Sequence, residues 1–229
     1  MSLEKKESYK HTLPHFQQPG QAYFVTWCLK NSVPKKALKR YTNELELLGD
    51  AISNRVSSRR LEIAAPNPEL EKLRMQYYSL RKKYIKAYDD LLDAERNPPV
   101  NLSNSVNTKI IIEAIQFWEG KKLLNRAWSV MPNHVHWVLQ LFEKDEEGKP
   151  VYLQDILQSV KRHTANRINK AEGRVGNLWQ KESFDTTIRD EKHLNFAIEY
   201  TLNNPVSAGL VIDQKDWPGN GHGIGCGEW

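Results

Sequence analysis

Hydrophobic positions along this chain repeat every second residue in some segments and every third or fourth in others. Aromatic and β-branched runs predict four strands, at 21–29, 126–131, 134–141 and 183–188. Amphipathic runs predict three helices, at about 105–119, 153–168 and 191–203, and Pro205 is expected to end the last of them. The order strand, helix, strand, strand, helix, strand, helix is that of a ferredoxin-like split βαβ unit with one appended helix. We therefore predict an α+β fold, with an antiparallel sheet and helices on one face.

A second helical pattern interrupts this unit after its first strand. Apolar residues recur at steps of three and four from Leu38 to Ile52, and at heptad-like spacing from Leu70 to Leu91. Ala65–Pro68 separates the two runs, so we predict an αα-hairpin inserted at about 35–100. Its outer Arg and Lys residues suit a solvated helix surface, or a basic arm that touches a nucleic acid backbone. We predict one domain over 1–218 and a poorly ordered Gly-rich tail over 219–229.

Composition narrows the class of protein. A hydrophobic fraction of 39% with seven Trp excludes a disordered chain, and a net charge of +5 suits a polyanionic partner without proving one. The two cysteines, Cys28 and Cys226, form no Cys-x-x-Cys, so no zinc ribbon is expected and a reducing cytoplasm is indicated. The charged N-terminus is not a signal peptide, and no apolar run is long enough to span a membrane. We expect a cytoplasmic protein.

The segment MPNHVH at 131–136 carries the first candidate chemistry. Side chains alternate along a strand, so His134 and His136 share one face, about 7 Å apart along it, and Val135 and Trp137 face a core. The Pro-Asn pair predicts a turn in which Asn133 tolerates a positive φ. The two imidazoles either hydrogen-bond on the sheet face, or hold a metal ion that keeps open positions for catalysis.

The last predicted helix carries Phe196, Tyr200 and Asn204 on one face, because they are spaced four residues apart. The amide oxygen of Asn204 can ligate a cation. Tyr200 is either half-buried packing or a nucleophile whose pKa a nearby cation lowers.

Four motifs carry a family resemblance. SVP stands at 32–34, MPNHVH at 131–136, LWQKESFDTTIRDE at 178–191 and YTLNNPVSAGLV at 200–211. This set, over roughly 21–218, resembles the REP-associated tyrosine transposases of the HUH single-tyrosine (Y1), IS200-like family. The chain departs from that pattern at Ser183, at Thr201 and after Pro218.

The resemblance implies an HUH fold and an enzyme that cuts and joins single-stranded DNA beside a hairpin. Tyr200 would be the nucleophile and form a 5′-phosphotyrosine link. His134 and His136 would hold a divalent ion, Mg²⁺ or Mn²⁺, with Asn204 as a third ligand. Monomer and homodimer both occur among such enzymes, so the oligomeric state stays open.

Basic and aromatic residues near this predicted site are assigned to DNA binding: Lys161, Arg162, Arg167, Trp179, Gln180 and Arg189. We expect Lys161, Arg162 and Arg167 to lie on the exposed face of the helix predicted at about 153–168 and to neutralise phosphates. Trp179 is a candidate for base stacking. Two other functions remain open at this point. One is a hairpin-DNA-binding protein that has lost catalysis, and the other is a metal-dependent nuclease that uses water as the nucleophile.

Overall fold

The structure is a computed structural model that describes residues 8–10, 14–16, 18–34, 36–58, 67–95 and 97–223. The chain divides into two compact units, one made of 1–32 with 95–229 and the other of 33–94. Within the described residues, no helix is long and apolar enough to cross a membrane.

The larger unit is built on a five-stranded sheet. Its strands are β3 (Ala22–Cys28), β4 (Leu123–Val130), β5 (His134–Leu141), β6 (Phe184–Ile188) and β7 (Asn220–Gly221). They follow the order β6-β3-β5-β4-β7, and every neighbouring pair is antiparallel. Strands β1 (Ser8–Lys10) and β2 (Pro14–Phe16) form a separate pair. Without β7 the order is that of the split βαβ unit, which confirms the predicted fold class.

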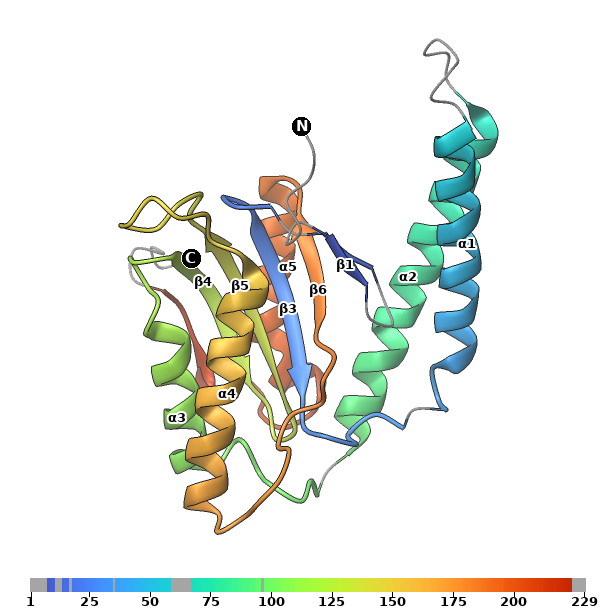
Figure 1. The fold of residues 1–229 in the computed structure, drawn as a ribbon. Helices are drawn as coiled ribbons and strands as arrows, with labels where there is room; N and C mark the ends of the chain where they lie inside the picture. Colours follow the sequence, from blue (N-terminus) through green and yellow to red (C-terminus); the bar gives the residue numbers. More distant parts are fainter. Residues whose placement is uncertain are drawn as a thin grey trace. The chain divides into compact units, whose positions relative to one another are not determined.

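Helices lie on both faces of this sheet. Figure 1 shows α3 (Ser105–Gln116) and α4 (Leu153–Ala171) on one side and α5 (Glu191–Ser207) on the other. The first face buries Trp27 and Trp137 against the first two helices, and the second buries Phe24 and Val138 against α5. The prediction of helices on one face is therefore wrong for α5. Its own apolar stripe needs a partner, and the second sheet face supplies one.

The last helix does not end before Pro205, as the sequence predicted. It continues to Ser207 because proline removes only the hydrogen bond to the residue four positions earlier, and the last turn tolerates this loss. The amides of Ala208 and Leu210 still donate to the carbonyls of Asn204 and Pro205. Asn204 therefore stays helical, one turn after Tyr200.

Asn220–Gly221 form a strand of the sheet, in contrast to the poorly ordered tail that we expected from 219; residues 224–229 lie outside the described part. After the short helix η1 (Gln214–Asp216), β7 pairs with β4, and the Gly219 carbonyl accepts from the Val130 amide. A Cβ on Gly219 would overlap the Val130 carbonyl. The Asn220 side chain donates to the Leu202 carbonyl at 2.8 Å and so ties this segment to α5.

The smaller unit, 33–94, contains the predicted αα-hairpin. Helices α1 (Lys39–Ser58) and α2 (Pro68–Ala94) bury Leu45, Leu70 and Tyr84. The rings of Tyr41 and Tyr84 meet edge to face at 6.3 Å between centroids. A nucleic-acid-binding role for its basic residues stays a prediction.

Candidate active site

His134 and His136 converge on the α5 side of the sheet. Both are fully buried, and their Nε2 atoms are 3.0 Å apart, much closer than the spacing of their residues along the strand. Burial lowers the pKa of His136 to about 3. Burial, followed by the charge of His136, also lowers the pKa of His134 well below its usual value. Both imidazoles are therefore neutral near pH 7, which is the form that binds metal ions.

The other ring nitrogens are held by neighbouring side chains. His134 Nδ1 lies 2.7 Å from Asn133 Oδ1, and the Asn133 amide group donates to Glu95 at 3.2 Å. His136 Nδ1 lies 2.8 Å from Thr26 Oγ1. These contacts orient both rings so that the Nε2 atoms face each other, as outer partners of metal-binding histidines commonly do.

Sequence reasoning missed these three supporting residues. Thr26 pairs directly with His136 across β3 and β5, so a correct strand register would have indicated it. Asn133 was assigned a turn with positive φ, but its backbone is not in that region, and its contribution comes from the side chain.

Helix α5 brings Tyr200 and Asn204 to the histidine pair. The Tyr200 and His136 rings meet edge to face at 5.7 Å between centroids. Phe24 stacks on His136 at 5.5 Å and meets the Tyr200 ring edge-on at 5.7 Å. Asn204 is buried and lies close enough to His134 to offset part of the lowering of the pKa of that imidazole. The Asn204 Oδ1 atom has no well-formed hydrogen bond within the described residues.

This donor set fits a small divalent ion. Two ligands of an octahedral Mg²⁺ or Mn²⁺ site, each about 2.1 Å from the ion, are themselves about 3.0 Å apart, as the two Nε2 atoms are. The buried Asn204 oxygen, which lies beside His134 without a well-formed hydrogen bond, is the kind of ligand that such ions accept. Within the described ranges, no cluster of three or more His, Cys, Asp or Glu residues forms a metal site. Two imidazoles and an amide leave positions open for substrate.

Trp179 is not available for base stacking. It is buried in the core beneath α4, where its indole N–H donates to Thr164 Oγ1 at 3.0 Å and its ring meets Trp27 edge-on. The stacking prediction for Trp179 is therefore wrong, because a bridge between Leu29 and Trp179 turns the indole inward.

Lys161 and Gln180 organise a loop rather than an exposed cationic face. The Lys161 ammonium donates to the carbonyls of Gln180 and Lys181 and to Ser183 Oγ, and burial lowers its pKa to about 8. The backbone amide of Gln180 donates to the Cys28 carbonyl, and the side-chain Oε1 atom of Gln180 lies 3.6 Å from the Cys28 sulfur. Cys28 is the cross-strand partner of His134, so this loop adjoins the histidine strand.

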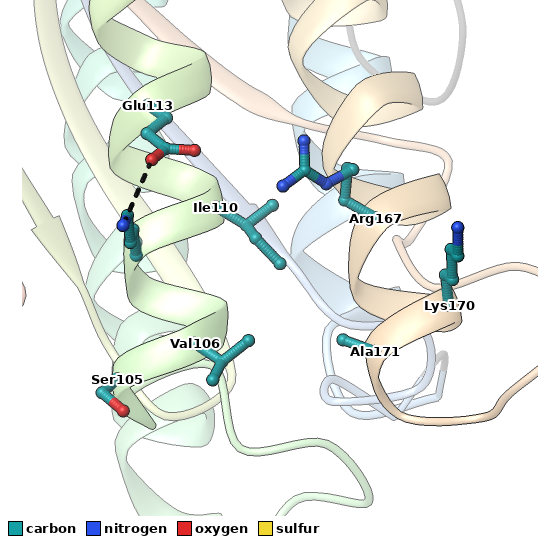
Figure 2. A pocket seen from close by; sticks show the side chains of 8 residues that line it. Ser105, Val106, Ile110, Glu113, Arg167, Lys170 and Ala171 are labelled. Carbon is teal, nitrogen blue, oxygen red and sulfur yellow. Dashed lines mark ion pairs between the residues drawn. The ribbon is translucent and has the colours of Figure 1, made fainter.

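The remaining cations of the predicted DNA-binding set divide between the two faces of the sheet. Arg162 and Arg167 are exposed, but α4 covers the face opposite the histidines. Figure 2 shows Arg167 and Lys170 across from Ile110, in a groove of about 890 Å³ between α3 and α4. These two arginines therefore do not surround the histidine pair. Arg189 is exposed and lies just before α5, the helix that carries Tyr200.

Comparisons with known proteins agree with the motifs. A protein of Haemophilus influenzae named as a REP-associated tyrosine transposase is 33% identical over 96 residues, which is 40% of this chain and 54% of that protein. A REP-associated tyrosine transposase of Escherichia coli K12 is 30% identical over 92 residues, which is 40% of this chain and 50% of that protein. The chain thus aligns with about half the length of these relatives.

A solved structure and the known family models were compared with the chain as well. One solved structure, of a REP-associated tyrosine transposase bound to a REP hairpin, shares 16% identity and a TM-score of 0.49 over 90% of this chain and 79% of that chain. No family model matches the chain. The chain is therefore similar to REP-associated tyrosine transposases, which confirms the resemblance that its motifs predicted.

Proposed function

We propose that this protein is a metal-dependent Y1 transposase that cleaves and joins single-stranded DNA beside a hairpin. One observation carries the proposal: a single chain brings the Tyr200 ring against His136, with Asn204 beside His134. A tyrosine beside metal-binding side chains suits a phosphotyrosine mechanism, and these residues come from strand β5 and helix α5, which are separate in the sequence.

Tyr200 acts on the scissile phosphate as the nucleophile. A bond forms between its phenolic oxygen and phosphorus, and the bond from phosphorus to the 3′ oxygen breaks. The phenol gives up its proton, and the 3′ oxygen takes the electron pair and one proton and leaves as a hydroxyl, so the step is balanced in protons and the 5′ phosphate stays on the tyrosine. A second 3′ hydroxyl reverses the reaction and joins strands. Such a cycle needs no ATP, because the phosphotyrosine bond conserves the energy of the broken bond.

His134, His136 and Asn204 would hold Mg²⁺ or Mn²⁺. When bound, the ion supplies Lewis-acid stabilisation of charge on the phosphate. The chain itself contributes two imidazoles that burial keeps neutral, and Thr26 and Asn133 orient them. Phe24 packs against both His136 and Tyr200 and so fixes the nucleophile's ring beside the histidine.

The proposed partner is hairpin DNA of the REP type, after the name of the two curated relatives. The net charge of +5 suits a polyanion. Arg189, just before α5, and Lys192, in the first turn of α5, are exposed and can contact backbone phosphates.

The test is incubation of the protein with REP-type hairpin DNA that carries single-stranded tails, in Mn²⁺, followed by a denaturing gel. We expect a covalent protein–DNA adduct that disappears in Tyr200→Phe. Tyr78→Phe, on the exposed surface of α2, is the matched control and keeps the adduct.

Other outcomes identify the two alternatives. Cleaved DNA with a free 5′ phosphate and no attached protein indicates a nuclease that uses water. Metal-independent binding without any cleavage indicates a DNA-binding protein. An adduct that persists in Tyr200→Phe contradicts the assignment of the nucleophile.

A further inference from the structure

Helix α5 carries a stripe of four side chains with distinct chemistry. Lys192, Phe196, Tyr200 and Asn204 follow one another at intervals of four residues, which places them on one face at steps of about 6 Å. The stripe runs from an exposed cation, through an aromatic ring and the proposed nucleophile, to the buried amide beside His134.

Phe196 is the unusual member of this stripe. It is 65% exposed, although it lies one helical turn from the buried histidine site. Its ring is nearly parallel to that of Tyr200, with planes at 24° and centroids 6.3 Å apart. Single exposed hydrophobic residues are common on protein surfaces, but this one presents a ring aligned with the proposed nucleophile.

The aromatic group around Tyr200 explains why Phe196 faces outward. Phe24 already contacts the Tyr200 ring from the sheet side, where it also stacks on His136. Phe196 therefore extends the same group of rings toward solvent, on the side from which a DNA strand can approach. Lys192, one further turn along, is exposed and able to contact a phosphate.

We infer that Phe196 is a stacking platform for the nucleobase next to the scissile phosphate, with Lys192 contacting the backbone beyond it. The inference rests on the proposed function, since it requires a single strand at Tyr200. Base stacking on an aromatic side chain tolerates any sequence, so Phe196 contributes affinity and alignment rather than recognition of the target. It holds the strand so that the phosphate lies at the Tyr200 hydroxyl.

Binding is measured by fluorescence anisotropy with a labelled hairpin DNA that carries single-stranded tails, in EDTA so that no cleavage occurs. Phe196→Ala is expected to weaken binding by about 5- to 150-fold, the usual effect of losing one stacked base. Phe196→Trp and Phe196→Tyr restore binding because they keep an aromatic face. Phe196→Leu stays weak because it keeps only the apolar surface.

Phe117→Ala is the matched control. Phe117 is 58% exposed but caps α3 on the opposite side of the sheet, where its ring contacts Trp118. This variant is expected to bind DNA like the wild type.

The dependence of affinity on salt separates stacking from charge. Phe196→Ala keeps the wild-type slope, whereas Lys192→Ala lowers the slope by roughly 0.7, the value for one phosphate contact on a single strand. A 2-aminopurine placed next to the cleavage position is expected to be quenched by the wild type and less quenched by Phe196→Ala.

Binding by Phe196→Ala or Phe196→Leu at wild-type strength would overturn the inference, and so would an equal loss in Phe117→Ala. Failure of the proposed function looks different: DNA binds and depends on Phe196, but no Tyr200 adduct forms with Mn²⁺. If the wild type binds no single-stranded DNA at all, both are overturned.

Discussion

The Tyr200 ring stands edge-on to the His136 imidazole, with centroids 5.7 Å apart and planes at 76°. This relationship joins α5 to the central strand of the sheet and brings a phenol to a pair of neutral imidazoles. It depends on packing around the two rings and on the contacts that hold α5 and the neighbouring loops in place, and each can be tested.

Phe24 packs against both rings, so its loss is expected to disturb the site and the fold together. Phe24→Ala should lower the free energy of unfolding by about 3–4 kcal/mol, because it leaves a cavity in the α5 core. Phe24→Leu should cost less, and Phe196→Ala, at an exposed position, almost nothing. Urea denaturation measures all three. A negligible change in Phe24→Ala would show that this ring does not support the site.

Thr26 is expected to control metal affinity without touching the ion. Thr26→Val removes the hydroxyl that holds His136 Nδ1 and keeps the side-chain shape, so Mn²⁺ affinity should fall by about 10- to 100-fold. Thr26→Ser keeps a hydroxyl and should stay near wild type. Isothermal titration calorimetry measures both. Equal affinities for the Val and Ser variants would refute this role of the hydroxyl.

The histidine pair predicts acid sensitivity of the fold. Burial lowers the pKa of both groups below the unfolded value of about 6.5, and that of His136 to about 3. As the pH falls below about 6.5, these histidines therefore bind protons in the unfolded chain before they do so in the folded protein. Each of them then lowers the free energy of unfolding by up to about 1.4 kcal/mol per pH unit. Stability is fully present above this window.

Denaturant unfolding between about pH 7 and pH 5 measures this slope, in a range above the ordinary pKa values of carboxylates. His136→Gln should reduce the slope, because one buried titrating group is lost and all the surface groups are shared with the wild type. Identical slopes would mean that the imidazole at 136 is not buried in its neutral form.

Gly219 is expected to be required for the fifth strand. A Cβ there would overlap the Val130 carbonyl, so Gly219→Ala should separate β7 from β4 and cost roughly 1–3 kcal/mol, as overpacking does. The Val130 amide, which donates to Gly219, should then lose protection from hydrogen exchange. Gly49→Ala in α1 is the control: its Cβ meets open space, and it should stabilise the helix. Continued protection of Val130 in Gly219→Ala would contradict the close approach.

Lys161 is expected to hold the 180–183 loop. Lys161→Met removes three hydrogen bonds to this loop, so hydrogen exchange there should accelerate, with a stability loss of about 1–2 kcal/mol. Lys170→Met, at an exposed position on the same helix, should leave the loop unchanged. Equal exchange in both variants would assign no positioning role to Lys161.

Local patterns in the sequence were sufficient for most of the elements, though not for β1, β2 or β7, and for part of the site. The period-two alternation of 134–141 predicted that His134 and His136 share a face opposite Trp137, and the structure confirms it. Spacing of four residues placed Tyr200 and Asn204 on one side of a helix, also as found. Both follow from backbone geometry within a single element, which a sequence displays directly.

Contacts between separate elements could not be predicted from these local patterns. Trp179 and Lys161 look exposed or DNA-facing in sequence, but a bridge to Leu29 and a cluster of loop acceptors turn both inward. The sequence around Gly219 and Gly221 predicts a poorly ordered Gly-rich tail, although both glycines are required because β4 approaches them closely. Which face of the sheet α5 covers was not predictable either, because burying its stripe against either face satisfies the same hydrophobic pattern.

The sequence by itself determined the strand and helix order, the shared face of the two histidines and the family resemblance, since each resides in short-range spacing. Only the tertiary structure decided that Thr26, Asn133 and Glu95 orient those histidines, that Phe24 joins them to Tyr200, and that Phe196 remains exposed beside Tyr200. These relationships depend on strand register and on the packing of α5, and some of the contacts that set them join distant parts of the sequence, as between Thr26 and His136, which are 110 positions apart.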